Sequence, residues 1–167
     1  RKLPGLIQQQ RELYQAANTQ PVPYYALLLM DGDSMGELVG RLNSPQDLSG
    51  CLGRFAGEVH EVIQPTVGRT VYAGGDDVMA LVSAKDALAI AMQLCDRYHA
   101  AFADPVKAGR LKEGEATISA TIVYSHWRYP LRQVLSTAHR LLDDVAKDRT
   151  GRDSVAMGLV LGSGLNA

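Results

Sequence analysis

Several residues and patterns that mark common protein classes are scarce in this chain of 167 residues. Its two cysteines, Cys51 and Cys95, lie far apart, so zinc-ligand spacing is missing and buried free thiols in a reducing compartment are expected. Acidic and basic residues number 18 and 17, and this balance argues against a broad surface for duplex nucleic acid. Apolar runs fall far short of the roughly 18 residues of a membrane span, and the N-terminal residues lack a signal-peptide pattern. We therefore expect a cytoplasmic protein that has no membrane association.

Catalysis by a serine or cysteine nucleophile is also poorly supported. None of the four histidines forms a usable constellation with a serine or a cysteine, and all lie in predicted helices or a loop. We interpret these histidines as structural: His60, His99, His126 and His139.

Hydrophobic periodicity divides the chain into alternating helices and strands. Residues 1–20 predict a polar lead-in helix, and residues 21–167 predict one domain. The expected strands are 24–30, a hairpin over 69–82, 116–124 and 152–161. The expected helices begin after Ser34, span 51–64, run from Ser83 to Phe102 and run from Pro130 to Lys147, with loops over 40–50 and 103–115. This order predicts an α+β fold of the ferredoxin-like kind, with a mostly antiparallel sheet and helices on one face.

The most informative feature that is present is a pair of acidic turns. Two apolar runs within 71–82 flank Gly74-Gly75-Asp76-Asp77, which predicts a hairpin with carboxylates at its tip. Adjacent carboxylates repel and raise one another's pKa, and a bound divalent cation offsets that repulsion. The run 24–30 ends in Asp31-Gly32-Asp33, so neighbouring strands would bring the acids together. The alternative is plain turn chemistry, because glycine and aspartate are favoured in turns.

Small and polar residues beside these acids predict a nucleotide cradle. The amides of Ser34, Met35 and Gly36 would open a helix and bind a triphosphate. The alternative for Asp33 and Ser34 is that they serve only as helix caps. Two glycines allow the hairpin turn and would let a substrate approach the backbone. The residues assigned to nucleotide binding on these grounds are Gly32, Asp33, Ser34, Met35, Gly36, Gly74 and Gly75.

These motifs, in this order, carry a resemblance to a known family. The acidic turn within 25–36 and the Gly74-Gly75-Asp76-Asp77 hairpin resemble the palm domain of the large subunit of type III CRISPR effector complexes. They are more distantly similar to GGDEF diguanylate cyclases and class III nucleotidyl cyclases. Ala146-Lys147 and Gly151-Arg152-Asp153 extend the match, which covers roughly residues 24–165. The resemblance implies a palm fold of the nucleotidyl cyclase type.

The resemblance also implies a reaction. Such palm subunits convert ATP into cyclic oligoadenylate second messengers when the complex engages target RNA. In nucleotidyl transfer a 3′-hydroxyl attacks an α-phosphate and pyrophosphate leaves, and two metal ions stabilise the charge on both oxygens. Mg²⁺ or Mn²⁺ prefers carboxylate oxygens, so we expect Asp31, Asp76 and Asp77 to hold two ions and to serve catalysis.

The implied partners and the role of Lys147 come from the same resemblance. The family uses a lysine at this place to neutralise the triphosphate, whereas a cation at the end of a helix is also favoured by the helix dipole alone. Partners would be ATP, other protein subunits, guide RNA and target RNA, with palm–palm pairing or a homodimer completing the acceptor site. The family's nuclease motif needs a His-Asp pair, and this dipeptide does not occur here.

Two alternatives stay open at the level of sequence. One is a diguanylate cyclase-like enzyme that uses GTP. The other is a non-catalytic module, either a nucleotide sensor or a scaffold within an RNA-guided complex.

Overall fold

A computed structural model describes residues 3–18, 20, 22–42 and 44–160 of the protein. The strands it describes are β1 (Tyr24–Gly32), β2 (Gly68–Gly74), β3 (Asp77–Ser83), β4 (Ile118–His126) and β5 (Val155–Val160). The helices it describes are α1 (Leu3–Ala16), α2 (Met35–Leu42), α3 (Pro45–Val62), α4 (Ala87–Ala101), α5 (Ala103–Lys107), α6 (Leu131–Arg140) and a π-helix, η1 (Leu141–Arg149).

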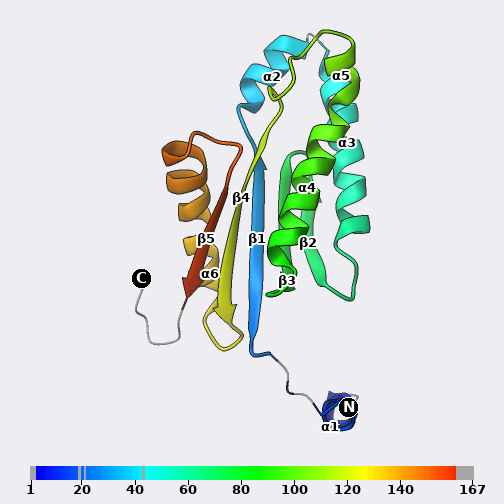
Figure 1. Cartoon of the computed structure of the whole chain (residues 1–167), viewed down its shortest axis with the longest axis vertical. Coiled ribbons are helices and arrows are strands. Elements are labelled where there is room, and N and C mark those ends of the chain that lie inside the picture. Colours follow the sequence, from blue (N-terminus) through cyan, green and yellow to red (C-terminus); the bar gives the residue numbers. More distant parts are fainter. Residues whose placement is uncertain (1–2, 19, 21, 43, 161–167) are drawn as a thin grey trace.

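The strands form one sheet in the order β2-β3-β1-β4-β5, with β1 at its centre (Figure 1). All neighbouring pairs are antiparallel except β4 and β5, which are parallel and joined by the crossover through α6 and η1. The predicted hairpin is formed by β2 and β3, and the predicted mostly antiparallel α+β fold is confirmed. Because β1 pairs with strands on both sides, the acidic turn at the C-terminal end of β1 lies at the middle of the sheet.

Helices cover both faces of this sheet, so the prediction of helices on one face is wrong. Alternate residues of β1 belong to two separate clusters: Leu28 and Met30 pack with α3 and α4, whereas Leu27 and Leu29 pack with α6 and η1. The physical reason is visible in the continuous apolar run 24–30, because a strand buried on both faces needs no polar alternation. The two helical layers therefore approach the end of β1 from opposite sides.

Two predicted loops contain helices. The segment 40–50 was expected to be a loop, but α2 continues to Leu42 and α3 begins at Pro45. Ser44 caps α3 by accepting a hydrogen bond from the Asp47 N–H at 3.3 Å, and proline is well suited to the first helical turn. The segment 103–115 includes the short helix α5. The predicted closing strand over 152–161 is β5, and its last predicted residue, 161, lies outside the described residues.

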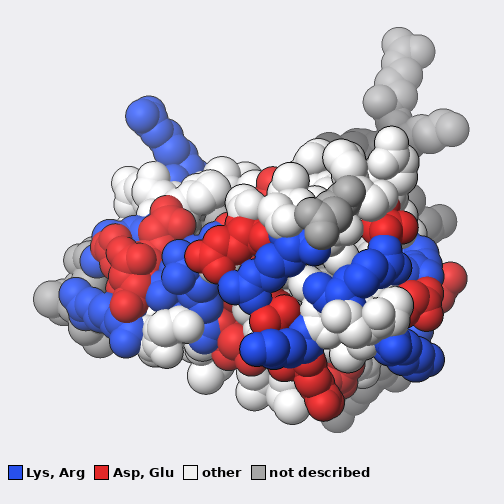
Figure 2. Space-filling view, turned by 90° about the horizontal axis from the view of Figure 1, so that it is seen from above, with Lys and Arg blue, Asp and Glu red and all other residues white. Residues whose placement is uncertain are grey.

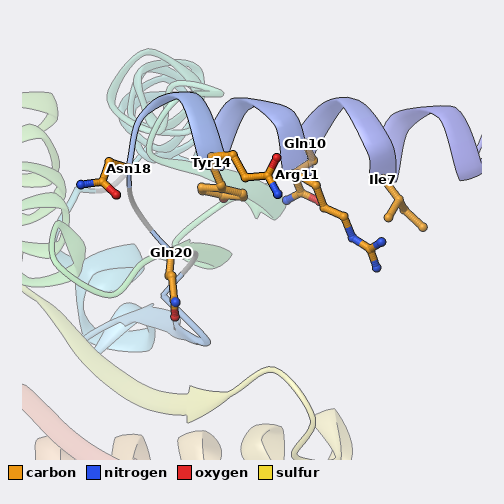
Figure 3. Close-up of a pocket in the computed structure, with 7 residues that line it drawn as sticks. Ile7, Gln10, Arg11, Tyr14, Asn18 and Gln20 are labelled. Carbon is orange, nitrogen blue, oxygen red and sulfur yellow. The ribbon is translucent and has the colours of Figure 1, made fainter.

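The predicted lead-in helix is α1, which lies beyond the lower end of the sheet (Figure 1). Its apolar side chains Leu6 and Leu13 are exposed. A hollow on one side of this helix is lined by Ile7, Gln10, Arg11, Tyr14, Gln15, Asn18 and Gln20, and includes no predicted site residue (Figure 3).

Within the described residues, no helix is both long and apolar enough to cross a membrane. Both cysteines are free thiols; Cys51 is buried as predicted, whereas Cys95 is half-buried, and this partial burial raises the pKa of Cys95 to about 11.

Candidate functional site

The two acidic turns meet at one edge of the sheet. The register of β1 against β3 ends at Met30 opposite Val78, and its continuation places Asp31 opposite Asp77 and Gly32 opposite Asp76. The packing at Gly32 agrees with that register: a Cβ atom added there would lie 2.7 Å from the Asp76 Cβ and 2.9 Å from its Oδ2. The glycine is therefore the surface against which Asp76 packs. Sequence reasoning assigned Gly32 to the cradle, and here it makes direct contact with the hairpin tip.

The three acids do not all point the same way. Successive side chains of a strand alternate between faces, and directly opposed residues share a face. Asp31 therefore projects toward the η1 side, whereas Asp76 projects with the Gly32 position toward α4, where Tyr98 lies. Among the described residues, no group of three acidic, histidine or cysteine side chains is close enough to hold a metal ion. A cation shared by Asp31 and Asp76 would have to sit beyond the edge of the sheet.

Asp31 already has a cationic partner. Its Oδ2 forms an ion pair with the Nζ of Lys147 from η1, and the two side chains are 31% and 18% exposed. Burial lowers the pKa of Lys147, and the positive charge of Arg152 lowers it further. The structure thus brings the predicted triphosphate lysine to one of the predicted metal ligands.

Asp76 lies against a buried tyrosine that sequence reasoning missed. The Tyr98 hydroxyl would be 2.9 Å from a Cβ at Gly32, the same separation as the Asp76 Oδ2, so both oxygens lie close to the same point. Partial burial raises the pKa of Asp76, and the charge of Asp77 raises it further. Burial and then Asp76 raise the pKa of Tyr98, whose hydroxyl donates to the Met35 Sδ at 3.5 Å. Asp77, in contrast, is exposed.

Asp33 is buried and fully engaged by protein donors. Its carboxylate accepts hydrogen bonds from the Thr117 hydroxyl at 2.9 Å, the Ser119 hydroxyl at 2.8 Å and the Asp153 N–H at 3.0 Å. It is 2% exposed, and its own N–H donates to the Thr117 carbonyl. These bonds tie the end of β1 to the start of β4 and to the loop before β5. In this arrangement Asp33 positions backbone rather than facing the other acids.

The residues expected to bind a triphosphate lie at the same end of the sheet as the acidic turns. Ser34 has a φ of +53°, an uncommon conformation for serine, and its carbonyl accepts the N–H groups of Glu37 and Leu38 at the start of α2. Met35 is half-buried and Gly36 is exposed. In the hairpin, Gly75 has a φ of +63°, which a glycine adopts without steric cost. A Cβ at Gly74 would lie 2.7 Å from the Tyr72 hydroxyl.

The segment that carries Lys147 has an unusual backbone conformation, because η1 is a π-helix. π-Helices are rare and occur frequently at functional sites. After η1, Gly151, Arg152 and Asp153 all have positive φ, at 85°, 73° and 47°. This loop shares a hollow with the start of α2, lined in part by Ser34, Arg41 and Arg152. Positive charge from Lys147 and Arg152 is therefore brought close to the acidic turns.

The wider surface at this end of the molecule has no dominant sign. Seen from above, lysine and arginine interleave with aspartate and glutamate among the described residues (Figure 2). Several of them are paired, as Arg41 with Glu115 at 2.6 Å and Arg54 with Asp104 at 2.8 Å. Any recognition of an anion at this end therefore depends on local groups.

Comparison with known proteins agrees with the motifs. The family model described as Cas10/Cmr2, second palm domain, matches residues 24–156. The chain is 32% identical over 173 residues to the CRISPR system Cmr subunit Cmr2 of Pyrococcus furiosus, covering 86% of this chain and 19% of that protein. The chain thus spans about a fifth of the length of this relative.

Solved structures share the fold. The complex of diguanylate cyclase SiaD with its activator SiaC from Pseudomonas aeruginosa gives a TM-score of 0.58 at 17% identity, covering 92% of this chain and 55% of that chain. The Csm1–Csm4 cassette in complex with pppApA gives 0.57 at 21% identity, covering 79% of this chain and 20% of that chain. Both the family model and the Cmr2 relative cover most of this chain. The suspected palm resemblance is confirmed: this chain belongs to the family of Cas10/Cmr2 second palm domains.

Proposed function

We propose that this chain is a metal-dependent nucleotidyltransferase palm that binds ATP and makes cyclic oligoadenylates within an RNA-guided CRISPR complex. The observation that carries the proposal is the contact between Gly32 and Asp76, which joins the two acidic turns at one edge of the sheet. Membership of the second palm family and the fold shared with a diguanylate cyclase add support.

In the proposed reaction the 3′-hydroxyl oxygen of one nucleotide bonds to the α-phosphorus of the next. The bond between the α- and β-phosphates breaks, pyrophosphate leaves and the hydroxyl proton passes to solvent. A Csm1–Csm4 cassette has been solved with pppApA, which is the compound that one such transfer between two ATP molecules forms. The adenine bases of that compound support ATP over GTP as the proposed substrate.

The donor types suit the proposed ions, although they are not assembled in one group. Carboxylate oxygens are the ligands that Mg²⁺ and Mn²⁺ prefer, and Asp31, Asp76 and Asp77 would supply them. Two bound ions would stabilise the attacking and leaving oxygens. The present arrangement keeps Asp31 on Lys147 and Asp76 on the opposite face, so binding of an ion shared by both requires side-chain movement.

The chain's own groups would bind and orient the nucleotide. The amides of Ser34, Met35 and Gly36 begin α2, where the helix dipole favours phosphate. Lys147, which is paired with Asp31, and Arg152, which lines the same hollow as Ser34, would add positive charge. Gly75 presents backbone with no atom within 4 Å of where a Cβ would lie, so a substrate can approach the hairpin tip there, whereas the Tyr72 hydroxyl fills the space at Gly74.

The test compares the Asp76→Ala/Asp77→Ala protein with wild type. Calorimetry would measure ATP binding in Mn²⁺, and mass spectrometry would detect cyclic oligoadenylates and linear intermediates. The matched control is Asp143→Ala/Asp144→Ala, which removes two adjacent exposed carboxylates from η1. We expect binding and product to be lost only in the first variant. Equal binding and equal product from both would end the proposal.

A second candidate is a GTP-using cyclase, favoured by the fold shared with SiaD. Competition between ATP and GTP for the same protein separates the two, because a diguanylate cyclase should prefer GTP. A non-catalytic scaffold, the third possibility, predicts no heat and no thermal shift with either nucleotide.

The proposed partners follow from the family. A relative that carries this domain is described as a subunit of a CRISPR system. We propose that other protein subunits, guide RNA and target RNA assemble around this palm, and that a second palm or a second copy completes the acceptor site. The isolated chain would then bind ATP and turn it over slowly.

A further inference from the structure

Lys147 is paired with Asp31, one of the three carboxylates proposed as metal ligands. Its ammonium group pairs with the Asp31 carboxylate, and both side chains are partly shielded from solvent. A cation attached to the chain therefore neutralises one of the three proposed ligands. A divalent cation that binds Asp31 is repelled by this ammonium group as long as the pair stays in place.

The backbone beside Lys147 is held by several hydrogen bonds. The carbonyl of Ala146, the preceding residue, accepts hydrogen bonds from the Ser154 hydroxyl at 2.7 Å, the Thr150 hydroxyl at 2.9 Å and the Arg152 N–H at 3.2 Å. Asp33 holds the same loop through the Asp153 N–H. The lysine side chain is a flexible four-carbon stem with a compact charge, which allows the ammonium to change partners while the backbone stays in place.

The electrostatics around Asp31 favour such an exchange when an anion arrives. Lys147 and Arg152 are two cations close enough for Arg152 to lower the pKa of Lys147. A triphosphate brings several negative charges and offers the ammonium a stronger partner than one carboxylate. The start of α2, across the same hollow as Arg152, provides amide donors on that path.

We propose that Lys147 is an exchangeable counter-ion of Asp31: it neutralises this carboxylate in the absence of nucleotide and moves to the triphosphate when nucleotide binds, which frees Asp31 for a divalent cation. This inference rests on the proposed function of the site. It makes nucleotide and metal binding interdependent, because each removes an obstacle to the other, and such coupling is reciprocal. A permanent structural ion pair would give no such coupling.

The test measures Mn²⁺ binding without nucleotide, from the electron paramagnetic resonance signal of free Mn²⁺. Lys147→Met removes the ammonium group and keeps most of the side-chain length. We expect it to bind Mn²⁺ about tenfold more tightly than wild type, because the competing positive charge is removed and coupling between two sites is typically about 5- to 150-fold. The same variant should bind ATP more weakly in the presence of a chelator. Opposite changes in the two affinities are the signature of exchange.

Three controls make the result specific. Lys85→Met changes an exposed lysine in the turn after β3, and Arg152→Met removes a nearby cation that has no ion pair with Asp31. Each should alter Mn²⁺ affinity less than Lys147→Met does. Asp31→Asn should weaken Mn²⁺ binding, which ties the signal to this carboxylate. Lys147→Gln serves as a second variant if thermal unfolding shows that Lys147→Met is poorly folded.

The outcomes separate this inference from the proposed function. If wild type and Lys147→Met bind Mn²⁺ equally and Asp31→Asn loses it, the exchange is refuted and the metal site stands. If Arg152→Met tightens Mn²⁺ binding as much as Lys147→Met, general charge repulsion replaces the exchange. If no variant binds Mn²⁺ with or without ATP, both the exchange and the metal-dependent function are refuted.

Discussion

Replacing Gly32 with alanine should separate the two acidic turns. The added Cβ would lie 2.7 Å from the Asp76 Cβ and 2.9 Å from both the Asp76 Oδ2 and the Tyr98 hydroxyl. Carbon atoms in contact prefer about 3.5 to 4.0 Å, so the hairpin tip must move by about 1 Å. The Asp76 Cβ is joined directly to the backbone and cannot rotate away. Relief must therefore come from displacement of the turn itself.

Two magnitudes follow from that displacement. Overpacking of this kind costs about 1–3 kcal/mol of unfolding free energy, and each kcal/mol lowers the melting temperature by about 2–4 °C in a chain of this size. A misplacement of about 1 Å in a reacting geometry costs about 100-fold in rate. We therefore expect Gly32→Ala to lose far more nucleotidyl transfer than its modest loss of stability would explain.

The assay pairs thermal unfolding with product formation from ATP and Mn²⁺. Gly40→Ala is the matched control, because a Cβ at that position in α2 meets no atom within 4 Å. It should raise stability by about 0.5–1 kcal/mol, since alanine suits a helix better than glycine, and leave transfer unchanged. A Gly32→Ala protein that melts and turns over like wild type would refute the packing argument.

Three further substitutions test neighbouring groups. Asp33→Ala removes the acceptor for the Thr117 and Ser119 hydroxyls and the Asp153 N–H, so urea unfolding should show a loss of about 3 kcal/mol or more, with a smaller loss for Asp33→Asn. Asp76→Asn should be more stable than wild type at neutral pH. The pKa of the Asp76 carboxyl is raised in the folded state, so folding favours its protonated form. The stability that protonation of Asp76 contributes is lost as the pH rises through the folded-state pKa, whereas asparagine is neutral at every pH. Urea titrations at a series of pH values should show the difference disappearing below the ordinary aspartate pKa of about 3.9; a constant difference would exclude this explanation. Tyr98→Phe should change the unfolding free energy by no more than about 1 kcal/mol, because the hydroxyl donates only to a thioether, a weak acceptor. A much larger loss in chemical denaturation would show that Asp76 depends on this hydroxyl for its place.

Local turn chemistry made the hairpin and its acidic tip predictable. Gly74 and Gly75 between two apolar runs specify a tight turn wherever the rest of the chain goes, and the run 24–30 specifies a buried strand. The same run also indicated burial on both faces, which the expectation of helices on one face overlooked. Motif order was sufficient for the family, because it depends on residues and not on their orientation.

The directions of the side chains could not be predicted. Whether Asp31 and Asp76 share a face depends on the register of β1 against β3, and a shift of one residue reverses every side chain. Tyr98 comes from α4 and carries no motif of its own. One available signal was missed: Thr117, Ser119 and Thr121 place polar side chains on alternate positions around the start of β4, between apolar neighbours. Such a stripe indicates a buried polar partner, which for two of them is Asp33.

The central position of β1 shapes how a nascent chain must fold. This strand needs β3 on one side and β4 on the other, and β4 is encoded well after the hairpin. At roughly 5–20 residues per second, several seconds of translation pass before β4 leaves the ribosome. During that interval one side of an apolar strand has unpaired amides and carbonyls, which is the condition under which strands associate with the wrong neighbour. Delayed pairing of one side of β1 during synthesis is therefore a consequence of placing the acidic turn on the innermost strand.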